Sequence, residues 1–331
     1  MNFENPFHPF SETAFDAYAL SLFRFQYENN QVYRAFCDGI QAPVKQINSI
    51  HQIPFLPVSF FKTHDIKTTP FEPETVFHSS GTTGMEFSKH PVKSLALYEN
   101  AFLSSFQYFY GDPSDYVFLA LLPNYLENKN SSLIYMMNHL IQNSPYAESG
   151  FFLYNHQDLH KTLLKMKEMG HKTILFGVTF ALLDFLESFT LDFPELIVFE
   201  TGGMKGRRKE MVKEEVHALI QKGLGVPTVH SEYGMCELLS QAYSKGENLF
   251  TTPPWMKIIL RDEKEPIPYY SDHFKYIEPQ SGAINIIDFA NVYSCSFIAT
   301  EDLGRRNRNG LIEITGRMDS ARLRGCNLMV I

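Results

Sequence analysis

The sequence predicts an α/β fold with a largely parallel sheet, followed by a smaller β-rich subdomain. Between residues 115 and 222, short apolar runs alternate with segments of helical spacing, as in strands joined by crossover helices. From about residue 250 onward, strand-like runs separated by turns replace this alternation. The length of 331 residues allows one large domain or two modest ones. We therefore place an α/β core at residues 1–250 and the β-rich subdomain at residues 251–331.

The N-terminal part is predicted to be mainly helical. Apolar residues at helical spacing, among them Phe15 and Tyr18, predict a helix over 11–37. Prolines punctuate the stretch HQIPFLPVSFFKTHDI at 51–66, which predicts a loop. A further helix is predicted over 93–110.

The central part is predicted to alternate between strands and helices. Predicted strands are 115–123, 149–154, 172–177 and 195–200, and predicted helices are 131–142, 157–169, 179–189 and 207–222. In the C-terminal part, the runs AINIIDFA, CSFIAT and LIEITG are the predicted strands of the β-rich subdomain.

Composition excludes several classes of protein. Hydrophobic residues make up 44% and charged residues 20%, which is a globular balance. A net charge of −8 argues against a nucleic-acid binder, which needs a basic face. No apolar run approaches the ~20 residues of a membrane span, and the start MNFENPFHPF lacks the pattern of a signal peptide. The four cysteines are scattered, which fits a reducing compartment. We expect a cytoplasmic protein.

The stretch FHSSGTTGMEFSKH, residues 77–90, is the most informative one. It holds six consecutive small residues, namely Ser79, Ser80, Gly81, Thr82, Thr83 and Gly84. Glycines let the backbone approach a ligand closely, and hydroxyl groups donate to anionic oxygens. A phosphate-binding loop and a flexible surface loop are both open interpretations. The stretch differs from the P-loop motif, because no lysine follows Gly84.

The loop closely resembles the SSGTTG signature of the adenylate-forming enzymes. That superfamily includes acyl-CoA synthetases, luciferases and the adenylation domains of peptide synthetases. Three further motifs follow in the family's order: ETGGMKG at 200–206, EYGMCE at 232–237 and TEDLGRRNRNGLIEITGRMD at 300–319. The resemblance implies the large N-terminal domain of an adenylate-forming enzyme, with mostly parallel sheets flanked by helices and a small β-rich subdomain.

The resemblance also implies roles for individual residues. The loop Ser79–Gly84 would wrap the β- and γ-phosphates of ATP, and Glu237 would help to hold Mg²⁺. Asp302 would bind the ribose hydroxyls, and Arg317 would approach the phosphates. The residues expected along the adenine are Thr201, Gly202, Gly203, Tyr233 and Gly234.

Each of these features alone has a simpler structural interpretation. The glycine pair could form a tight turn, and Glu237 could be a helix-capping carboxylate. Asp302 could belong to a turn, and Arg317 could form a surface ion pair. The joint order of the four motifs favours the nucleotide-binding interpretation.

The C-terminal sequence indicates a branch of the superfamily. After GRMD the sequence reads SARLRGCNLMVI, whereas in phenylacetate-CoA ligase-like members a similar RGxN stretch leads into a mobile C-terminal domain. We expect that domain to be absent. The chain then resembles the acyl-protein synthetases (LuxE type) of bacterial luminescence operons. The stretch LPVSFFKTHDI at 56–66 and the loop variant SGTTGMEFSKH fit that family.

This second resemblance implies that ATP activates a fatty acid and that the acyl group moves to a cysteine, then to a partner reductase. Cys326, in RGCN, matches the acyl-accepting cysteine, and Arg322 and Arg324 favour its thiolate. A small buried hydrophobic role is the alternative for Cys326. Lys62 is an additional candidate cation at the phosphates, with a solvated surface lysine as the alternative.

Other functions stay open at this point. The chain could hand its adenylate to coenzyme A or a carrier protein, or it could be a non-catalytic nucleotide-binding scaffold. A hydrolase with Ser79 or Ser80 as nucleophile fits less well, because the sequence lacks GxSxG. The leading hypothesis requires ATP, Mg²⁺, a carboxylic acid and an acyl-accepting protein partner.

Overall fold

A computed structural model describes residue 3 and residues 5–79, 87–123, 130–202, 211–263 and 278–318. The chain divides into two compact units. The first unit comprises Met1–Glu74, Ser88–Ser94 and Pro254–Ile331, and the second comprises Thr75–Phe87 and Leu95–Pro253. The domain boundary that the sequence suggests near residue 250 stays a prediction.

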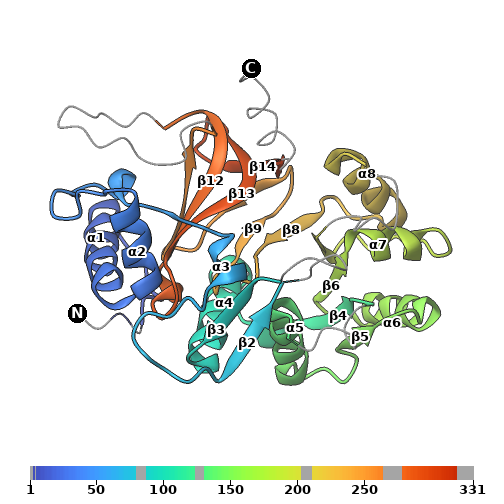
Figure 1. The fold of residues 1–331 in the computed structure, drawn as a ribbon. Coiled ribbons are helices and arrows are strands. Elements are labelled where there is room, and N and C mark those ends of the chain that lie inside the picture. The colour runs from blue at the N-terminus through green and yellow to red at the C-terminus, as the bar shows by residue number, and fades with distance from the viewer. Residues whose placement is uncertain are drawn as a thin grey trace, which may run out of the picture. The chain divides into compact units, whose positions relative to one another are not determined.

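The first unit combines N-terminal helices with an antiparallel sheet from the C-terminal part of the chain (Figure 1). Its helices are α1 Glu12–Asn29, α2 Gln31–Gly39, α3 Phe60–Thr63 and the 3₁₀ helices η1 Ile50–Gln52 and η3 Phe289–Asn291. Its strands are β1 Leu56–Pro57, β3 Lys89–Val92, β11 Met256–Arg261, β12 Ser281–Asp288, β13 Phe297–Arg306 and β14 Ile312–Arg317. Strands β11 to β14 pair antiparallel in sequence order, and β1 pairs parallel with β13.

One helix predicted over 11–37 is two helices in the structure. Asn30 lies between them with extended backbone angles, φ −111° and ψ 108°. Its backbone N–H donates to the Gln26 carbonyl at the end of α1, and its side-chain oxygen accepts from Tyr33 N at 3.0 Å. Asparagine is a strong N-capping residue, so this local hydrogen bond breaks a helix that the apolar spacing alone would continue.

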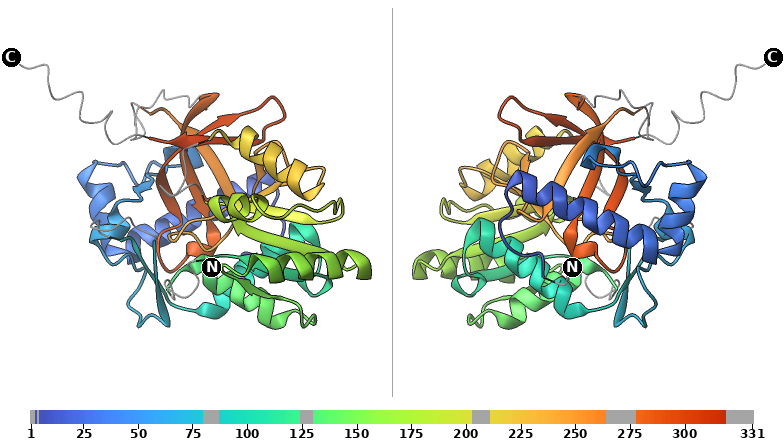
Figure 2. Two further views of the ribbon diagram at one scale, coloured as in Figure 1. Left: turned by 90° about the vertical axis from the view of Figure 1, so that its right-hand side faces the viewer. Right: turned by 90° about the vertical axis from the view of Figure 1, so that its left-hand side faces the viewer.

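Helix α1 packs against the sheet of its own unit (Figure 2). Phe15 stacks on Phe289 with ring centroids 4.4 Å apart. The buried Gln26 amide donates to the carbonyls of Asn291 and Val292, each at 3.0 Å. Apolar contact and satisfied buried polar groups therefore join the N-terminal helix α1 to residues 289–292 within this unit.

The second unit contains the largely parallel sheet that the sequence predicts, with strand order β10-β9-β8-β7-β6-β4-β5. Its strands are β2 Thr75–His78, β4 Val117–Leu121, β5 Gly150–Phe152, β6 Thr173–Val178, β7 Ile197–Thr201, β8 His230–Tyr233, β9 Ala242–Ser244 and β10 Leu249–Thr251. Its helices are α4 Leu95–Tyr110, α5 Ser132–Asn143, α6 His156–Met169, α7 Thr179–Leu186, α8 Lys213–Leu224 and the 3₁₀ helix η2 Pro113–Asp115. Strands β5, β4, β6, β7 and β8 pair parallel, and β8, β9 and β10 pair antiparallel.

The central strands of this sheet are apolar because helices cover both faces. Every residue of β4 and β6 is buried, which matches the continuous apolar runs expected of parallel strands. Helices α6 and α8 end at Gly170 and Gly225, both in the left-handed conformation that glycine adopts without strain. Within the described part of the chain, no helix is both long and apolar enough to cross a bilayer.

We predict that Asn30→Ala lowers the free energy of unfolding by about 2–3 kcal/mol. The substitution removes the cap of α2 and the donors that Asn30 Nδ2 gives to Ser294 O and Thr68 Oγ1, all in a buried position. The neighbouring Asn29→Ala is the matched control, because Asn29 is exposed and its amide bonds only the Phe25 carbonyl. Chemical denaturation measures both variants, and equal stability loss in the two would contradict the capping role.

Candidate functional site

Two of the predicted nucleotide-binding segments meet at one edge of the parallel sheet in the second unit. Strands β7 and β8 are parallel neighbours, with Glu200 opposite Ser231. Thr201, the last residue of β7, donates its hydroxyl to Glu232 Oε2 at 3.0 Å. Gly202 therefore follows β7 beside the point where Tyr233 ends β8. The carboxyl ends of parallel strands are where ligands bind in α/β sheets.

Two glycines fit this edge for steric reasons. Gly202 has φ 75°, a conformation that other residues adopt only with strain. At Gly234, an added Cβ would lie 2.3 Å from Glu232 Oε1. The backbone conformation therefore favours glycine at 202, whereas at 234 a Cβ would only require the tip of the Glu232 side chain to move. Gly203, the third predicted glycine-loop residue, lies outside the described residues.

Sequence reasoning missed Glu232 as a site residue. The residue keeps some exposed surface, but its carboxyl group is buried. Burial raises the pKa of Glu232 to about 7, although the Thr201 hydrogen bond and the Lys213 charge act against it. Its position directly before Tyr233 in the EYGMCE motif was the available signal.

A second buried carboxylate, Glu200, anchors the end of β7. It accepts a hydrogen bond from the Thr179 hydroxyl at the start of α7. Its Oε2 lies 3.5 Å from Lys213 Nζ and 3.6 Å from His217 Nε2, both on α8. Burial raises the pKa of Glu200, but His217, Lys213 and Thr179 together outweigh burial, so the pKa is lowered. The charged carboxylate ties β7 to two helices and holds Thr201 in place.

The rest of the EYGMCE motif follows β8. Tyr233 packs against Phe250, with ring centroids 6.1 Å apart. Glu237 is 4% exposed, and no group of three His, Cys, Asp or Glu side chains gathers as a metal site among the residues described. Mg²⁺ commonly binds one or two carboxylates together with substrate phosphates. A single buried carboxylate at Glu237 would be compatible with that mode, and its role at a metal ion stays a prediction.

The predicted phosphate loop is described only at its first residue. Ser79 directly follows β2, whose last residue His78 donates its backbone N–H to the Asn130 carbonyl at 2.9 Å. The residues Ser80, Gly81, Thr82, Thr83 and Gly84 lie outside the described residues.

In the first unit, Asp302 and Arg317 lie next to each other, and the nucleotide roles predicted for them stay predictions. They face each other across β13 and β14, and Arg317 Nε donates to Asp302 Oδ1 at 3.1 Å. The Arg317 side chain is 72% exposed and the Asp302 side chain 13%. An exposed ion pair of this kind contributes little to stability.

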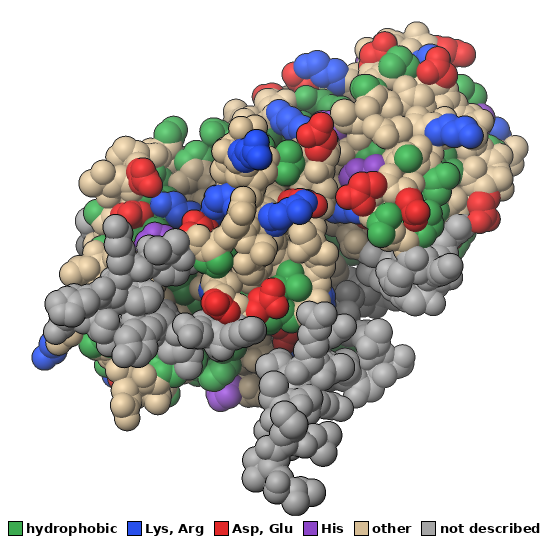
Figure 3. Space-filling view, turned by 90° about the horizontal axis from the view of Figure 1, so that it is seen from above, with side chains coloured by type: hydrophobic (Ala, Val, Ile, Leu, Met, Phe, Trp, Pro, Cys, Tyr) green, Lys and Arg blue, Asp and Glu red, His purple; other side chains and the backbone are tan. Residues whose placement is uncertain are grey.

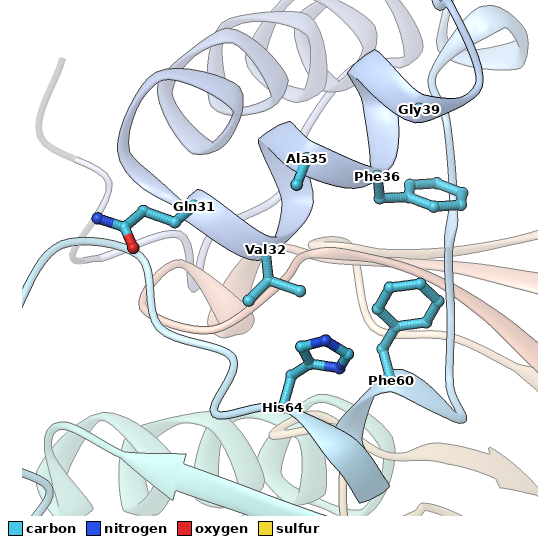
Figure 4. Close-up of a pocket in the computed structure, with 7 residues that line it drawn as sticks. All are labelled: Gln31, Val32, Ala35, Phe36, Gly39, Phe60 and His64. Atoms are coloured by element: carbon cyan, nitrogen blue, oxygen red, sulfur yellow. The ribbon is translucent and has the colours of Figure 1, made fainter.

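Lys62 lies on the short helix α3 of the same unit, between Phe60 and His64 in sequence, which Figure 4 labels. Strand β1, just before α3, pairs with the start of β13, with Pro57 opposite Ala299. Phe60 and His64 stack on one side of α3 and line an apolar groove of about 450 Å³ that α2 completes. Helical spacing directs Lys62 away from that groove. Lys62 is exposed and forms no ion pair with the described part of the chain.

The cysteines that the structure describes are buried and lie outside disulfide bonds, namely Cys37, Cys236 and Cys295. Burial raises the pKa of Cys37 to about 12 and raises that of Cys295 as well, which disfavours the nucleophilic thiolate. These thiols fit structural roles. Cys326, the candidate acyl acceptor, lies outside the described residues.

Charged side chains of both signs are interspersed on the molecular face drawn in Figure 3. The described residues on that face therefore differ from the continuous basic face that a nucleic-acid binder presents.

Comparison with known proteins gives a family and a fold. The family model "Acyl-protein synthetase, LuxE" matches residues 8–331. The ATP-bound structure of MatB from Rhodopseudomonas palustris is similar, with a TM-score of 0.52 and 17% identity over 73% of this chain and 47% of that chain. A 2-hydroxyisobutyryl-CoA ligase in complex with 2-HIB-AMP has a TM-score of 0.63 and 13% identity over 95% of this chain and 70% of that chain.

The two structures share the fold with this chain, which resembles the N-terminal domains of adenylate-forming enzymes. The match spans about half the length of MatB, 47%. A search of curated proteins gave no significant match.

We predict that Glu232→Gln stabilises the protein at pH 8 and loses this advantage toward pH 4. The fold favours the protonated carboxyl, because its pKa is about 7 in the folded protein against an ordinary 4.5. The wild type therefore loses stability as pH rises from 4.5 through 7, by at most about 3 kcal/mol at ~1.4 kcal/mol per pKa unit. Glutamine does not titrate and escapes this loss.

Melting temperatures measured across pH 4 to 8 test this prediction. Glu168→Gln is the control, because Glu168 is exposed on α6. A Glu232→Gln effect that is constant with pH would show that burial does not raise the pKa of Glu232.

Proposed function

The chain belongs to the LuxE acyl-protein synthetase family, and we propose that it is an ATP-dependent ligase that activates a carboxylic acid as an acyl-adenylate and transfers the acyl group to a protein thiol. The meeting of Thr201–Gly202 with Tyr233–Gly234 at the carboxyl edge of the parallel sheet is the observation that best supports this. Both segments belong to motifs that the adenylate-forming enzymes use for adenine. Tyr233 would lie against the adenine ring, and Asp302 would accept from the ribose hydroxyls.

In the first half-reaction, a carboxylate oxygen of the acid attacks the α-phosphorus of ATP. The bond from that phosphorus to the bridging oxygen breaks, and pyrophosphate leaves. Negative charge accumulates on the phosphate oxygens, so the reaction needs positioned donors and cations more than proton transfer. Arg317 and Lys62 are the candidate cations, and the loop from Ser79 to Gly84 is the candidate pyrophosphate cradle. Bound Mg²⁺, held with Glu237, would offset polyphosphate charge.

In the second half-reaction, a thiolate attacks the carbonyl carbon of the acyl-adenylate. A thioester forms, the bond to the AMP oxygen breaks, and AMP leaves. Cys326 is the proposed acceptor, because Arg322 and Arg324 precede it and nearby cations favour the thiolate. The acyl group would then pass to a protein partner. We propose a fatty acid as the substrate, in keeping with the family.

Transfer to free coenzyme A is the second candidate function. The fold likeness to a 2-hydroxyisobutyryl-CoA ligase over 95% of this chain supports it. The two functions share the first half-reaction and differ only in the thiol that attacks the adenylate. Formation of acyl-CoA from free coenzyme A distinguishes them directly.

We predict that the protein catalyses ATP–pyrophosphate exchange only when a suitable carboxylic acid is present. A panel of short, medium and long fatty acids and aryl acids would identify the acid class. Glu237→Gln should reduce exchange by about a hundredfold or more, because it removes a carboxylate from the proposed metal site. Glu168→Gln should exchange normally. Absence of exchange with every acid would contradict the proposed ligase and favour a nucleotide-binding scaffold.

We predict that Cys326→Ser keeps acid-dependent exchange but no longer becomes labelled by radioactive acid plus ATP. The label on the wild type should be released by neutral hydroxylamine, which cleaves thioesters. Cys236→Thr is the control, because threonine is usual at that position in the motif, and it should retain the label. Labelling of Cys326→Ser at the wild-type level would rule out Cys326 as the acceptor.

A further inference from the structure

Strand β13 bulges at the position that carries Asp302. On one side of the irregularity Ala283 pairs with Leu303, and on the other side Asn285 pairs with Ala299. Ile284 alone therefore stands opposite the three residues 300–302 of β13. Bulges interrupt the ladder of backbone hydrogen bonds and redirect side chains, often next to functional sites.

The side chain of Arg261 occupies this interruption. Arg261 ends β11, and its guanidinium reaches across β12 to β13. Nη1 donates to Ile284 O at 2.8 Å and to Asn285 Oδ1 at 2.9 Å, and Nη2 donates to Thr300 O at 2.7 Å. The guanidinium thus satisfies carbonyl oxygens on both strands that flank the bulge.

Thr300 connects the guanidinium to the backbone of Asp302. Its hydroxyl donates to Ile284 O at 2.9 Å and accepts from Asp302 N at 3.1 Å. Arg261, Thr300 and Asp302 therefore form a continuous chain of hydrogen bonds. On the next strand, Arg317 contacts the Asp302 carboxylate.

The charge of Arg261 is unusual for its position. The residue is 8% exposed, Ile284 is fully buried and Thr300 is 1% exposed. All three acceptors are neutral, and among the residues described no carboxylate pairs with Arg261. Burial lowers the pKa of Arg261 to about 10, which leaves the guanidinium charged at neutral pH. Burying a cation without a counter-charge is costly. The planar guanidinium reduces this cost because it donates hydrogen bonds to three oxygen atoms at once.

We propose that Arg261 is a positioning residue that fixes the bulge at 300–302 and so aims the Asp302 carboxylate at the nucleotide ribose. The inference rests on the proposed function, in which Asp302 accepts from the ribose hydroxyls. Without the guanidinium, Ile284 O and Thr300 O lose donors, and the bulge can relax toward a regular ladder that turns Asp302 elsewhere.

Equilibrium dissociation constants for ATP and 2′-deoxy-ATP test the proposal on the full-length protein. A hydrogen bond from the ribose hydroxyl to a charged carboxylate should make wild type prefer ATP by about tenfold. Arg261→Met and Thr300→Val should both reduce the preference to less than about twofold, because each breaks the hydrogen-bond chain. Arg261→Lys should restore part of it, since lysine keeps the charge but lacks the fork.

Arg306→Met is the matched control. Arg306 lies on β13 beyond the bulge, where it donates to Ile258 O and Gly310 O and pairs with Glu278. Its removal should lower the melting temperature and leave the preference for ATP unchanged. A merely structural role of Arg261 would give the same result as this control.

Asp302→Asn separates failure of the inference from failure of the proposed function. If Asp302→Asn keeps the wild-type preference for ATP, Asp302 does not bind the ribose. In that case the proposed role of Asp302 and the inference about Arg261 are both wrong. If Asp302→Asn loses the preference while folded Arg261→Met and Thr300→Val keep it, the positioning role of Arg261 is overturned. If Arg261→Met does not fold, Thr300→Val decides, because it retains the buried arginine.

Discussion

The parallel pairing of β7 with β8 is the constraint that brings the Thr201 and Tyr233 segments together in the second unit. Parallel neighbours end at the same edge of a sheet, so residues separated by about thirty positions in sequence become adjacent. The pairing alone does not fix the ends of the strands. Thr201 adds a side-chain bond to Glu232, and the Glu200 carboxylate binds α7 and α8. Side-chain contacts within the protein therefore hold the ends of both β7 and β8.

Each unit buries a charged side chain close to a residue with a proposed nucleotide contact, and the two buried charges have opposite signs. Glu200 is a buried anion that lies beside Lys213 and His217 and accepts from a hydroxyl group. Arg261 is a buried cation that carbonyl and amide oxygens compensate. Glu200 directly precedes Thr201, and Arg261 donates to the backbone two residues before Asp302. A nucleotide contact is proposed for both Thr201 and Asp302. Since a buried charge is tolerated only in well-formed geometry, both charges penalise displacement of the backbone that they hold.

The sequence predicts the regular parts of the fold well, because they follow from local pattern. The alternation of apolar runs and helical spacing over 115–222 gives strands β4 to β7 and helices α5 to α7 near their observed positions. The break at Asn30 was missed, because one capping hydrogen bond outweighs the apolar spacing of a longer helix. Strand β8 was also missed. Its sequence HSEY is mostly polar, and pairing with β7 and β9 is what makes it a strand.

The candidate site residues fall into the same two groups. Some are recognisable from a short stretch of sequence, and others only from contacts with residues distant in sequence. Motif residues such as Asp302 and Arg317 could be proposed because short stretches of sequence single them out. Glu232 lies within the EYGMCE motif but was not singled out, and Arg261 lies outside the motifs. The significance of both residues comes from contacts across neighbouring strands. The buried state of Arg261 in particular depends on residues that follow it by more than twenty positions. A single sequence does not reveal such pairs without the register of the sheet.

Register also explains why Asp302 and Arg317 meet. The pairing of β13 with β14 shifts between Leu303 and Gly304, so the two strands carry irregularities next to each other. At Gly304 an added Cβ would lie 3.1 Å from Ile284 Cδ1 and 3.2 Å from Glu313 O. A larger residue would require Ile284 or the Glu313 carbonyl to shift by a few tenths of an ångström. Glycine at 304 and arginine at 261 thus both favour this backbone geometry, the first because it leaves room between the strands and the second because it donates to the carbonyl oxygens beside the bulge.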